Sequence, residues 1–360
     1  MMVHVNSTVK YPTKMPTAIF LDSGGVINDN RKRAPQWIRY LGEFLPTTAL
    51  GGNAQIWGMA NMEMIGPFFR RWHEFMDQAT LLAAQAKARA RDRAMTVDGS
   101  KEGEKGEEET NVYRIFERLH LLIWIKEMCQ VASRHLPANN DLLTKTLPTL
   151  TDDALFDIAK SAHVYAIQRV RADYPGAVDA IRSIKSMPEK MGLYTSSADS
   201  FEDLETILRG LGVFEEFDVV YGADRVDCLK NSEEYYRRVF KAVGVLRVVS
   251  RKEEHGQQGG IKETEEKDAG QNDVKNDDAN NNTNEEDEAV EVVVVDDSVK
   301  ALKYARVHGA RTVLITSLSD GDQELDLSLE EYKHVDYQLK ALSDLPALMD
   351  SWRAHFSRSS

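Results

Sequence analysis

The sequence predicts an α/β protein whose parallel sheet is covered by helices, with an all-helical domain inserted into it. Two observations predict the class. Short apolar runs alternate with helical patterns in the second half of the chain, and an apolar run near the N-terminus is separated from them by a long helical region. Alternation of strands and helices is typical of parallel sheets, because each crossover places a helix on one face.

The composition limits the other possibilities. The chain has 360 residues, 42% of them hydrophobic and 29% charged, and this length suits about two domains with sizeable cores. The formal charge of −13 argues against nucleic acid or an anionic membrane as a partner. Cys129 and Cys228 are the two cysteines, which excludes a disulfide framework and fits a reducing compartment. We therefore expect a cytoplasmic protein, and the sequence does not indicate its oligomeric state.

Neither export nor membrane insertion is expected. The segment Met1–Pro16 lacks an apolar core of secretory length. The longest apolar runs, near 121–125 and 289–295, have the length of a strand or of part of a helix and fall short of a bilayer span.

The first predicted strand is Thr17–Leu21, which ends in Asp22 and a glycine-rich turn. A short apolar run closed by Asp and two glycines reads as a buried parallel strand that delivers one carboxylate to its carboxyl end. Ligands bind at this end of the strands in open α/β sheets. Asp22 is therefore a candidate for chemistry, although an Asp before Gly-Gly is also a common turn.

The region 30–171 has helical character throughout. Apolar residues recur at helical spacing around 37–45, 65–75, 119–131 and 155–170, and Thr151 is placed to cap the last of these helices. Within this region, 97–111 has almost no apolar residues and is rich in Gly, Glu and Lys, which predicts a mobile loop.

The period changes after Tyr174-Pro175-Gly176. The expected strands are 191–194, 217–221, 290–295, 312–315 and 335–339, and the expected helices are 177–187, 201–211, 232–243, 299–308 and 345–356. The stretch 250–288 is polar and asparagine-rich, so it cannot bury enough apolar surface to offset its ordering entropy. We predict that it is a disordered insertion.

Polar side chains occur at or after the carboxyl ends of four predicted strands. They are Asp22, Thr195 with Ser196, Lys230 in a loop, and Asp296 with Asp297. Taken singly, each has a structural explanation, since hydroxyl and carboxylate groups often cap helices and a loop lysine is often solvated. Two adjacent carboxylates at the end of an apolar strand nevertheless repel each other. A divalent cation would relieve this repulsion, and oxygen ligands of this kind suit Mg²⁺.

These residues, in this order, resemble the four motifs of the haloacid dehalogenase-like hydrolase superfamily, and the phosphatase type in particular. Asp22 falls at the position of the family's nucleophile, Thr195 at its hydroxyl position, Lys230 at its lysine, and Asp296-Asp297 at its acidic fourth motif. The resemblance implies a Rossmann-like three-layer core formed by residues 1–29, 172–249 and 289–360. The helical region 30–171 looks like the family's cap.

The resemblance also implies a function and a set of roles. The protein would be a Mg²⁺-dependent phosphohydrolase that acts on a small phosphorylated substrate through an aspartyl-phosphate on Asp22. Lys230, Thr195 and the groups around Ser23, Gly24 and Ser196 would bind the phosphoryl oxygens. The implied magnesium ligands are Asp22, the carbonyl of Gly24, Asp296 and Asp297.

The sequence departs from the family at Gly24, where phosphatases usually carry a second aspartate that acts as general acid and base. Two alternatives therefore remain beside a phosphatase that favours easy leaving groups: a weak or inactive phosphate-binding or regulatory protein, and a metal-independent dehalogenase. Asp29, His73 and His163 are the residues that could supply the missing acid.

The predicted cap also contains basic and aromatic side chains that could contact a substrate, although such residues usually face water or fill cores. These are Arg31, Lys32, Arg33, Arg70, Arg71, Trp37, Trp57, Trp72 and Trp124.

Overall fold

The computed structural model describes most of the chain. The described residues are 4–5, 14–96, 110–136, 145–245, 291–316 and 329–359. The predicted disordered insertion, 250–288, lies outside them, as does the predicted mobile loop 97–111 except for its last two residues.

A six-stranded sheet forms the centre of the fold, in the order β1-β6-β5-β4-β2-β3. All neighbouring strands are parallel except β1, which runs antiparallel to β6. This topology confirms the predicted α/β class. The two residues of β1 were not predicted as a strand, because so short a segment carries no periodic signal. The strands are β1 (His4–Val5), β2 (Ala18–Leu21), β3 (Gly192–Thr195), β4 (Val292–Asp296), β5 (Arg311–Ile315) and β6 (Tyr337–Leu339).

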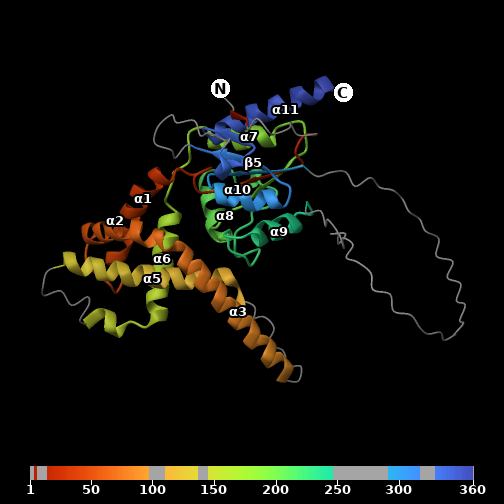
Figure 1. Cartoon of the computed structure of the whole chain (residues 1–360). Helices are drawn as coiled ribbons and strands as arrows, with labels where there is room; N and C mark the ends of the chain where they lie inside the picture. Colours follow the sequence, from red (N-terminus) through yellow and green to blue (C-terminus); the bar gives the residue numbers. More distant parts are fainter. Residues whose placement is uncertain are drawn as a thin grey trace, which may run out of the picture.

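Helices cover both faces of the sheet, so its central strands are apolar on both sides. Ile19 and Leu21 of β2 pack in a cluster with α7, α8 and α11, whereas Ala18 and Phe20 pack in a second cluster with α9 and α10. Figure 1 shows these helices gathered around the sheet. They are α7 (Ala177–Lys185), α8 (Phe201–Gly210), α9 (Glu233–Ala242), α10 (Val299–Val307) and α11 (Leu345–Ser359).

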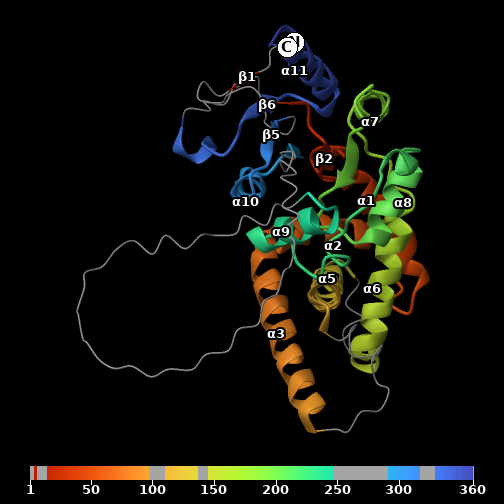
Figure 2. The same cartoon turned by 90° about the vertical axis from the view of Figure 1, so that its right-hand side faces the viewer.

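The helices α1 to α6 follow β2 in the chain, and we call them the helical insertion. Its helices lie together to one side of the sheet, and α3 extends away from the rest of the molecule (Figures 1 and 2). Thr151 caps α6 as predicted, because its side chain accepts a hydrogen bond from the Ala154 N–H. The helices are α1 (Asn30–Phe44), α2 (Ala54–Arg70), α3 (Trp72–Thr96), α5 (Val112–His135) and α6 (Asp152–Ile167).

Short 3₁₀ helices occur between these elements. They are η1 (Leu45–Thr47), η3 (Leu147–Thr149), η4 (Phe214–Glu216), η5 (Glu330–Tyr332) and η6 (Leu342–Asp344). None of the helices that the structure describes combines the length and the apolarity needed to span a bilayer.

The two ends of the helical insertion lie side by side. The Asp29 N–H donates to the Ala172 carbonyl at 2.6 Å, and the Tyr174 N–H donates to the Ile27 carbonyl at 3.0 Å. The chain therefore leaves the sheet and returns to it at almost the same point.

The segment 217–221 does not form the predicted strand, and only Val219 makes an isolated bridge to β3. Side chains make hydrogen bonds to main-chain groups here that strand pairing would otherwise satisfy. Asp218 Oδ2 accepts a main-chain N–H of β3 at 2.8 Å, while Thr195 Oγ1 accepts from the Tyr221 N–H at 2.7 Å and donates to the Tyr221 carbonyl at 3.0 Å. Because side chains satisfy these main-chain groups, the segment follows the sheet edge without regular pairing.

Candidate functional site

Asp22 lies at the carboxyl end of β2, between β3 and β4. Its N–H donates to the Val295 carbonyl at 3.0 Å, which places it beside the end of β4. Since β4 ends at Asp296, the parallel register brings the first and last acidic motifs to one sheet edge. The local strand pattern and the topology together bring these two carboxylates close to each other.

The turn after Asp22 is shaped by its two glycines. Gly25 has φ +78°, and a Cβ added there would lie 1.9 Å from Asp297 Oδ2, so only glycine leaves room for this carboxylate. Gly24 is different, because a Cβ there would meet only the Asn30 side-chain amide, at 3.7 Å. The turn is fixed by the Ser23 carbonyl, which accepts from the N–H groups of residues 27 and 28.

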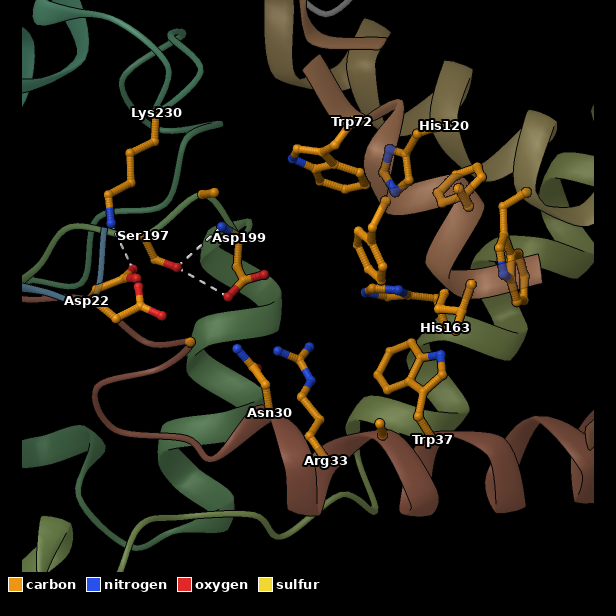
Figure 3. A pocket seen from close by; sticks show the side chains of 18 of the residues that line it. Asp22, Asn30, Arg33, Trp37, Trp72, His120, His163, Ser197, Asp199 and Lys230 are labelled. Carbon is orange, nitrogen blue, oxygen red and sulfur yellow. Dashed lines mark hydrogen bonds and ion pairs between the residues drawn. The ribbon is translucent and has the colours of Figure 1, made fainter. Parts of the chain in front are cut away.

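The site contains three carboxylates and one ammonium group. Oxygen atoms of Asp22, Asp296 and Asp297 lie within 4.8 Å of one another. Lys230 Nζ pairs with Asp22 Oδ1 at 2.8 Å and with Asp296 Oδ2 at 2.7 Å, and Figure 3 shows the lysine reaching Asp22. Tyr236 also donates its hydroxyl to Asp296 Oδ2 at 3.3 Å. The structure thus brings Asp22, Lys230, Asp296 and Asp297 together.

Burial and mutual repulsion make this cluster electrostatically strained. Burial is the main reason that the pKa of Asp22 lies well above its ordinary value, and Asp296 and Asp297 raise this pKa further while Lys230 opposes them. Burial and Asp296 raise the pKa of Asp297 from 3.8 to about 6. Burial disfavours the charged Lys230 side chain, but Asp22 and Asp296 outweigh it and raise the lysine pKa well above its ordinary value. An additional cation would therefore be stabilised here.

The structure places the predicted hydroxyl motif differently from expectation. Thr195 and Ser196 are fully buried. The Thr195 hydroxyl is bound to the Tyr221 main chain, and the Ser196 N–H donates to the Leu21 carbonyl at 2.9 Å. Neither group lines the pocket that contains Asp22.

Ser197 lines the pocket from this loop instead. Its Oγ donates to Asp199 Oδ2 at 3.1 Å and accepts from the Asp199 N–H at 3.3 Å, as Figure 3 shows. Tyr235 fixes the loop, since its hydroxyl donates to the Ser197 carbonyl at 2.9 Å. Ser23 also stays outside the pocket, and its hydroxyl accepts the Asn28 amide at 3.1 Å.

The pocket is a cavity of about 650 Å³ between the sheet edge and the helical insertion. In Figure 3, Asp22 and Lys230 lie on one side of it, and Trp72, His120 and Trp37 lie on the other. The insertion contributes polar and aromatic side chains to this wall. Among them are Asn30, Arg33, Trp37, Asn61, Phe68, Trp72, His120, Trp124 and His163.

Arg33 is the residue of the predicted basic set that lines this pocket. Its guanidinium lies 5.3 Å from the Trp37 ring centroid. No hydrogen bond or ion pair engages it within the described part of the chain. Trp37, Trp72 and Trp124 line the pocket, whereas Trp57 is fully buried and donates its indole N–H to the Gly51 carbonyl at 2.7 Å.

The three candidates for a general acid are placed in different environments. Asp29 is buried at the start of α1, and hydrogen bonds from Arg31 outweigh burial and lower its pKa, so it is ionised. His73 is exposed and does not line the pocket. His163 does line it and pairs with Asp203 at 3.0 Å, but Figure 3 shows it across the pocket from Asp22. None of the three is placed to protonate a leaving group beside Asp22.

The loop that carries Lys230 is tied to the helical insertion. Asp227 adopts the left-handed conformation with φ +46°. Its carboxylate pairs with Lys87 of α3 at 2.6 Å and accepts the Val112 N–H at the start of α5 at 2.7 Å. These contacts position the loop relative to the pocket wall.

Sequence reasoning missed Ser197, Asp199, Asn61 and His120, which all line the pocket. The only signal for Ser197 and Asp199 is their nearness to Thr195 in the chain. No sequence motif marks Asn61 or His120, because each is one of several polar residues in its helix.

Comparisons with known proteins identify the family of the chain. The family model described as haloacid dehalogenase-like hydrolase matches residues 16–253, a range that includes Asp22 and Lys230 but ends before Asp296. No curated protein shows significant sequence similarity to the chain.

Several solved structures are similar in fold. An L-2-haloacid dehalogenase is 14% identical with a TM-score of 0.50, and the match covers 93% of this chain and 99% of that one. The magnesium-bound HAD-hydrolase YfnB from Bacillus subtilis is 13% identical with a TM-score of 0.45, covering 94% and 100%. The L-2-haloacid dehalogenase from Xanthobacter autotrophicus is 13% identical with a TM-score of 0.44, covering 93% and 99%. At such identities the likeness concerns the fold alone.

Proposed function

Because this chain belongs to the haloacid dehalogenase-like hydrolase family, we propose that it is a Mg²⁺-dependent phosphohydrolase that uses Asp22 as its nucleophile. The family membership makes it a hydrolase. The phosphate specificity, the metal and the roles of individual residues are the proposal.

The observation that carries the proposal is the charge of the cluster. Asp22, Asp296 and Asp297 together with Lys230 have a formal charge of −2 when all four are ionised. A divalent cation would neutralise this charge, and carboxylate oxygens are the ligands that Mg²⁺ prefers. A dehalogenase needs no such neutralisation, and the extra carboxylates would repel its anionic substrate.

Asp22, Asp296 and Asp297 would hold magnesium through their carboxylates, and Gly24 would add its main-chain carbonyl. When bound, the ion would reduce the repulsion between an anionic nucleophile and an anionic phosphate. Asp22 attacks the phosphorus with a carboxylate oxygen, and the bond between phosphorus and the leaving oxygen breaks. Lys230 binds a phosphoryl oxygen, and water then cleaves the acyl phosphate to regenerate Asp22 and release phosphate.

Gly24 limits the leaving groups that this mechanism can release. No acid stands at that position, so the leaving oxygen must depart as a stable anion or take its proton from water. We therefore expect preference for phosphates with easy leaving groups, such as aryl, acyl or anomeric phosphates. Arg33 supports an anionic substrate, since it brings a guanidinium without an ion-pair partner among the described residues to the pocket.

A second candidate follows from the same residue. If the missing acid abolishes turnover, the protein would be a phosphate-binding or regulatory member of the family. Its site would still bind Mg²⁺ and phosphate through the cluster and Lys230.

The proposed location is the cytoplasm. Cys129 and Cys228 are free and buried, which agrees with a reducing compartment. The proposed partner is a small phosphorylated molecule.

Phosphate release with Mg²⁺ tests the proposal on a panel of aryl, acyl and sugar phosphates. Release should require Mg²⁺ and disappear in Asp22→Asn, whereas Asp179→Asn, an exposed carboxylate on α7, should behave as wild type. Mg²⁺ binding by calorimetry without turnover on the whole panel would support the regulatory function instead. Halide release from 2-haloacids in the presence of chelator would overturn both.

A further inference from the structure

The cavity is much larger than a phosphoryl group requires. Its volume of about 650 Å³ lies within the range of roughly 300–1,000 Å³ typical of pockets for drug-sized ligands. The reacting carboxylates occupy one side only, as Figure 3 shows. The remaining space must therefore receive the leaving group.

The far side of the cavity has flat aromatic walls. Trp37 comes from α1, Phe68 from α2, Trp72 from α3 and Trp124 from α5, so four helices each contribute one ring. Trp72 is held by edge contacts with Phe116, at a centroid distance of 4.9 Å. Aromatic faces favour flat ring systems, which bury a large area at little entropic cost.

Within this wall, Asn61 has an unsatisfied side chain. It is only 2% exposed, and its Oδ1 atom has no hydrogen-bond partner in the described part of the protein. A buried polar group without a partner costs about 1–3 kcal/mol. A ligand that donates an N–H or O–H group would remove this cost.

His120 offers a second acceptor. Its Nδ1 lies 2.8 Å from the Phe116 carbonyl oxygen, which can only accept, so Nδ1 carries the proton. Burial lowers the pKa of His120 to about 4, so the ring is neutral and Nε2 has a free lone pair. No residue described in the structure donates to Nε2.

We propose that the pocket selects phosphate esters whose leaving group is a flat bicyclic aromatic ring bearing an N–H or O–H donor directed at Asn61 and His120. This inference rests on the proposed phosphohydrolase function for the reaction itself. The phosphoryl group lies at Asp22 and Lys230, and the ring extends between the tryptophans. An aryl oxygen is also a leaving group that needs no acid at Gly24.

The test compares three aryl phosphates with leaving groups of similar acidity. These are indol-5-yl phosphate, benzofuran-5-yl phosphate, which replaces the N–H by an oxygen, and phenyl phosphate, which lacks the second ring. We expect kcat/KM for the indolyl ester to exceed that for the benzofuranyl ester by about 10-fold, because one buried acceptor gains a donor. The benzofuranyl ester should exceed phenyl phosphate by about 10-fold, because the second ring buries more apolar area, and the indolyl ester should therefore exceed phenyl phosphate by about 100-fold.

Two variants locate the effect. The single N–H of the indole bonds one acceptor, so Asn61→Leu or His120→Phe, whichever removes that acceptor, should bring the indolyl-to-benzofuranyl ratio close to one. A wild-type ratio in both variants would overturn the proposed donor contact. Met62→Leu is the matched control, since Met62 is 62% exposed beside Asn61 on α2, and it should keep the wild-type ratio. Thermal melts establish whether each variant is folded. If one variant does not fold, the other still tests the proposal.

Calorimetric binding of 5-hydroxyindole and 5-hydroxybenzofuran tests the ring site independently of the proposed phosphohydrolase reaction. Equal kcat/KM for all three esters would overturn the ring preference and leave the phosphohydrolase intact. Tight binding of 5-hydroxyindole that weakens in Asn61→Leu or in His120→Phe, without turnover of any ester, would support the ring site and contradict the phosphohydrolase. If the protein neither binds 5-hydroxyindole nor turns over any ester, both the ring site and the phosphohydrolase function are overturned.

Discussion

Replacing Gly24 by aspartate should supply the general acid that the site lacks. The structure accommodates the change, because a Cβ at Gly24 meets only the Asn30 amide at 3.7 Å and Gly24 is not among the residues with positive φ. The new carboxyl group would stand close to the cluster of Asp22, Asp296 and Asp297. Their negative charge raises its pKa, so that it can hold a proton near neutral pH.

The size of the effect follows from the chemistry of the leaving group. A positioned general acid is worth about 10²–10⁴ in rate, and this gain applies only where the leaving oxygen needs a proton. For ethyl phosphate, we expect Gly24→Asp to increase kcat/KM by about this factor. For 4-nitrophenyl phosphate, whose leaving group is already a stable anion, the rate should hardly change.

The assay measures phosphate release at saturating Mg²⁺ with esters of graded leaving-group pKa. A steep dependence of rate on leaving-group pKa in the wild type should become shallow in Gly24→Asp. The matched control is Gly24→Asn, which has the same shape but no proton to donate. Equal gains in both variants, or an equal gain on every ester, would refute the argument.

Three further predictions concern stability and the metal. With chelator present, Asp297→Asn should be more stable than wild type by up to about 3 kcal/mol at pH 7.5. This figure comes from the rise of the Asp297 pKa from 3.8 to about 6, at about 1.4 kcal/mol per pKa unit. In urea unfolding, the stability of the wild type should fall as the pH rises through this interval, and a flat profile would contradict the assignment. Gly25→Ala should lower the stability of the protein by at least about 1–2 kcal/mol, because residue 25 has φ +78°. It should also weaken Mg²⁺ binding measured by calorimetry, because the added Cβ would meet Asp297. Unchanged Mg²⁺ affinity would argue against Asp297 as a ligand. His163→Gln should destabilise the protein by about 3 kcal/mol. Despite burial, the ion pair raises the pKa of His163 above 6.5 and lowers the pKa of Asp203 below 3.8. The stability lost in the variant should therefore be greatest between pH 3.8 and 6.5 and should shrink at lower and at higher pH. A stability difference between variant and wild type that does not vary with pH would exclude the ion pair.

The parallel sheet and its acidic end could be predicted because their signals are local. The apolar runs before Asp22 and Asp296 are long enough to mark buried strands, and parallel strands bring their carboxyl ends together. The helices of the insertion were likewise visible in the spacing of their apolar residues.

The hydroxyl of the second motif could not be assigned from sequence. Thr195 and Ser197 are two residues apart and chemically alike, and the choice depends on whether the Tyr221 main chain takes the threonine hydroxyl. That contact depends on how the segment after α8 lies along the sheet edge. It is a tertiary detail, and no local pattern encodes it.

Two polar residues of the pocket wall could not be predicted from the sequence, although Arg33 and three tryptophans of this wall were among the predicted candidates. Asn61 and His120 lie on different helices, and both look like ordinary polar positions in their own surroundings. Their significance comes from a cavity that forms only when the helices of the insertion pack together over the sheet.

The adjacent ends of the helical insertion have an evolutionary consequence. Because Asp29 and Ala172 are hydrogen-bonded to each other, a turn of a few residues could join them without changing the register of β2 and β3. Substitutions among the helices can therefore alter the pocket wall while Asp22, Asp296 and Asp297 keep their geometry. Selection can act on substrate choice and on chemistry as two nearly independent traits, and new specificities can arise by exchange of the insertion alone.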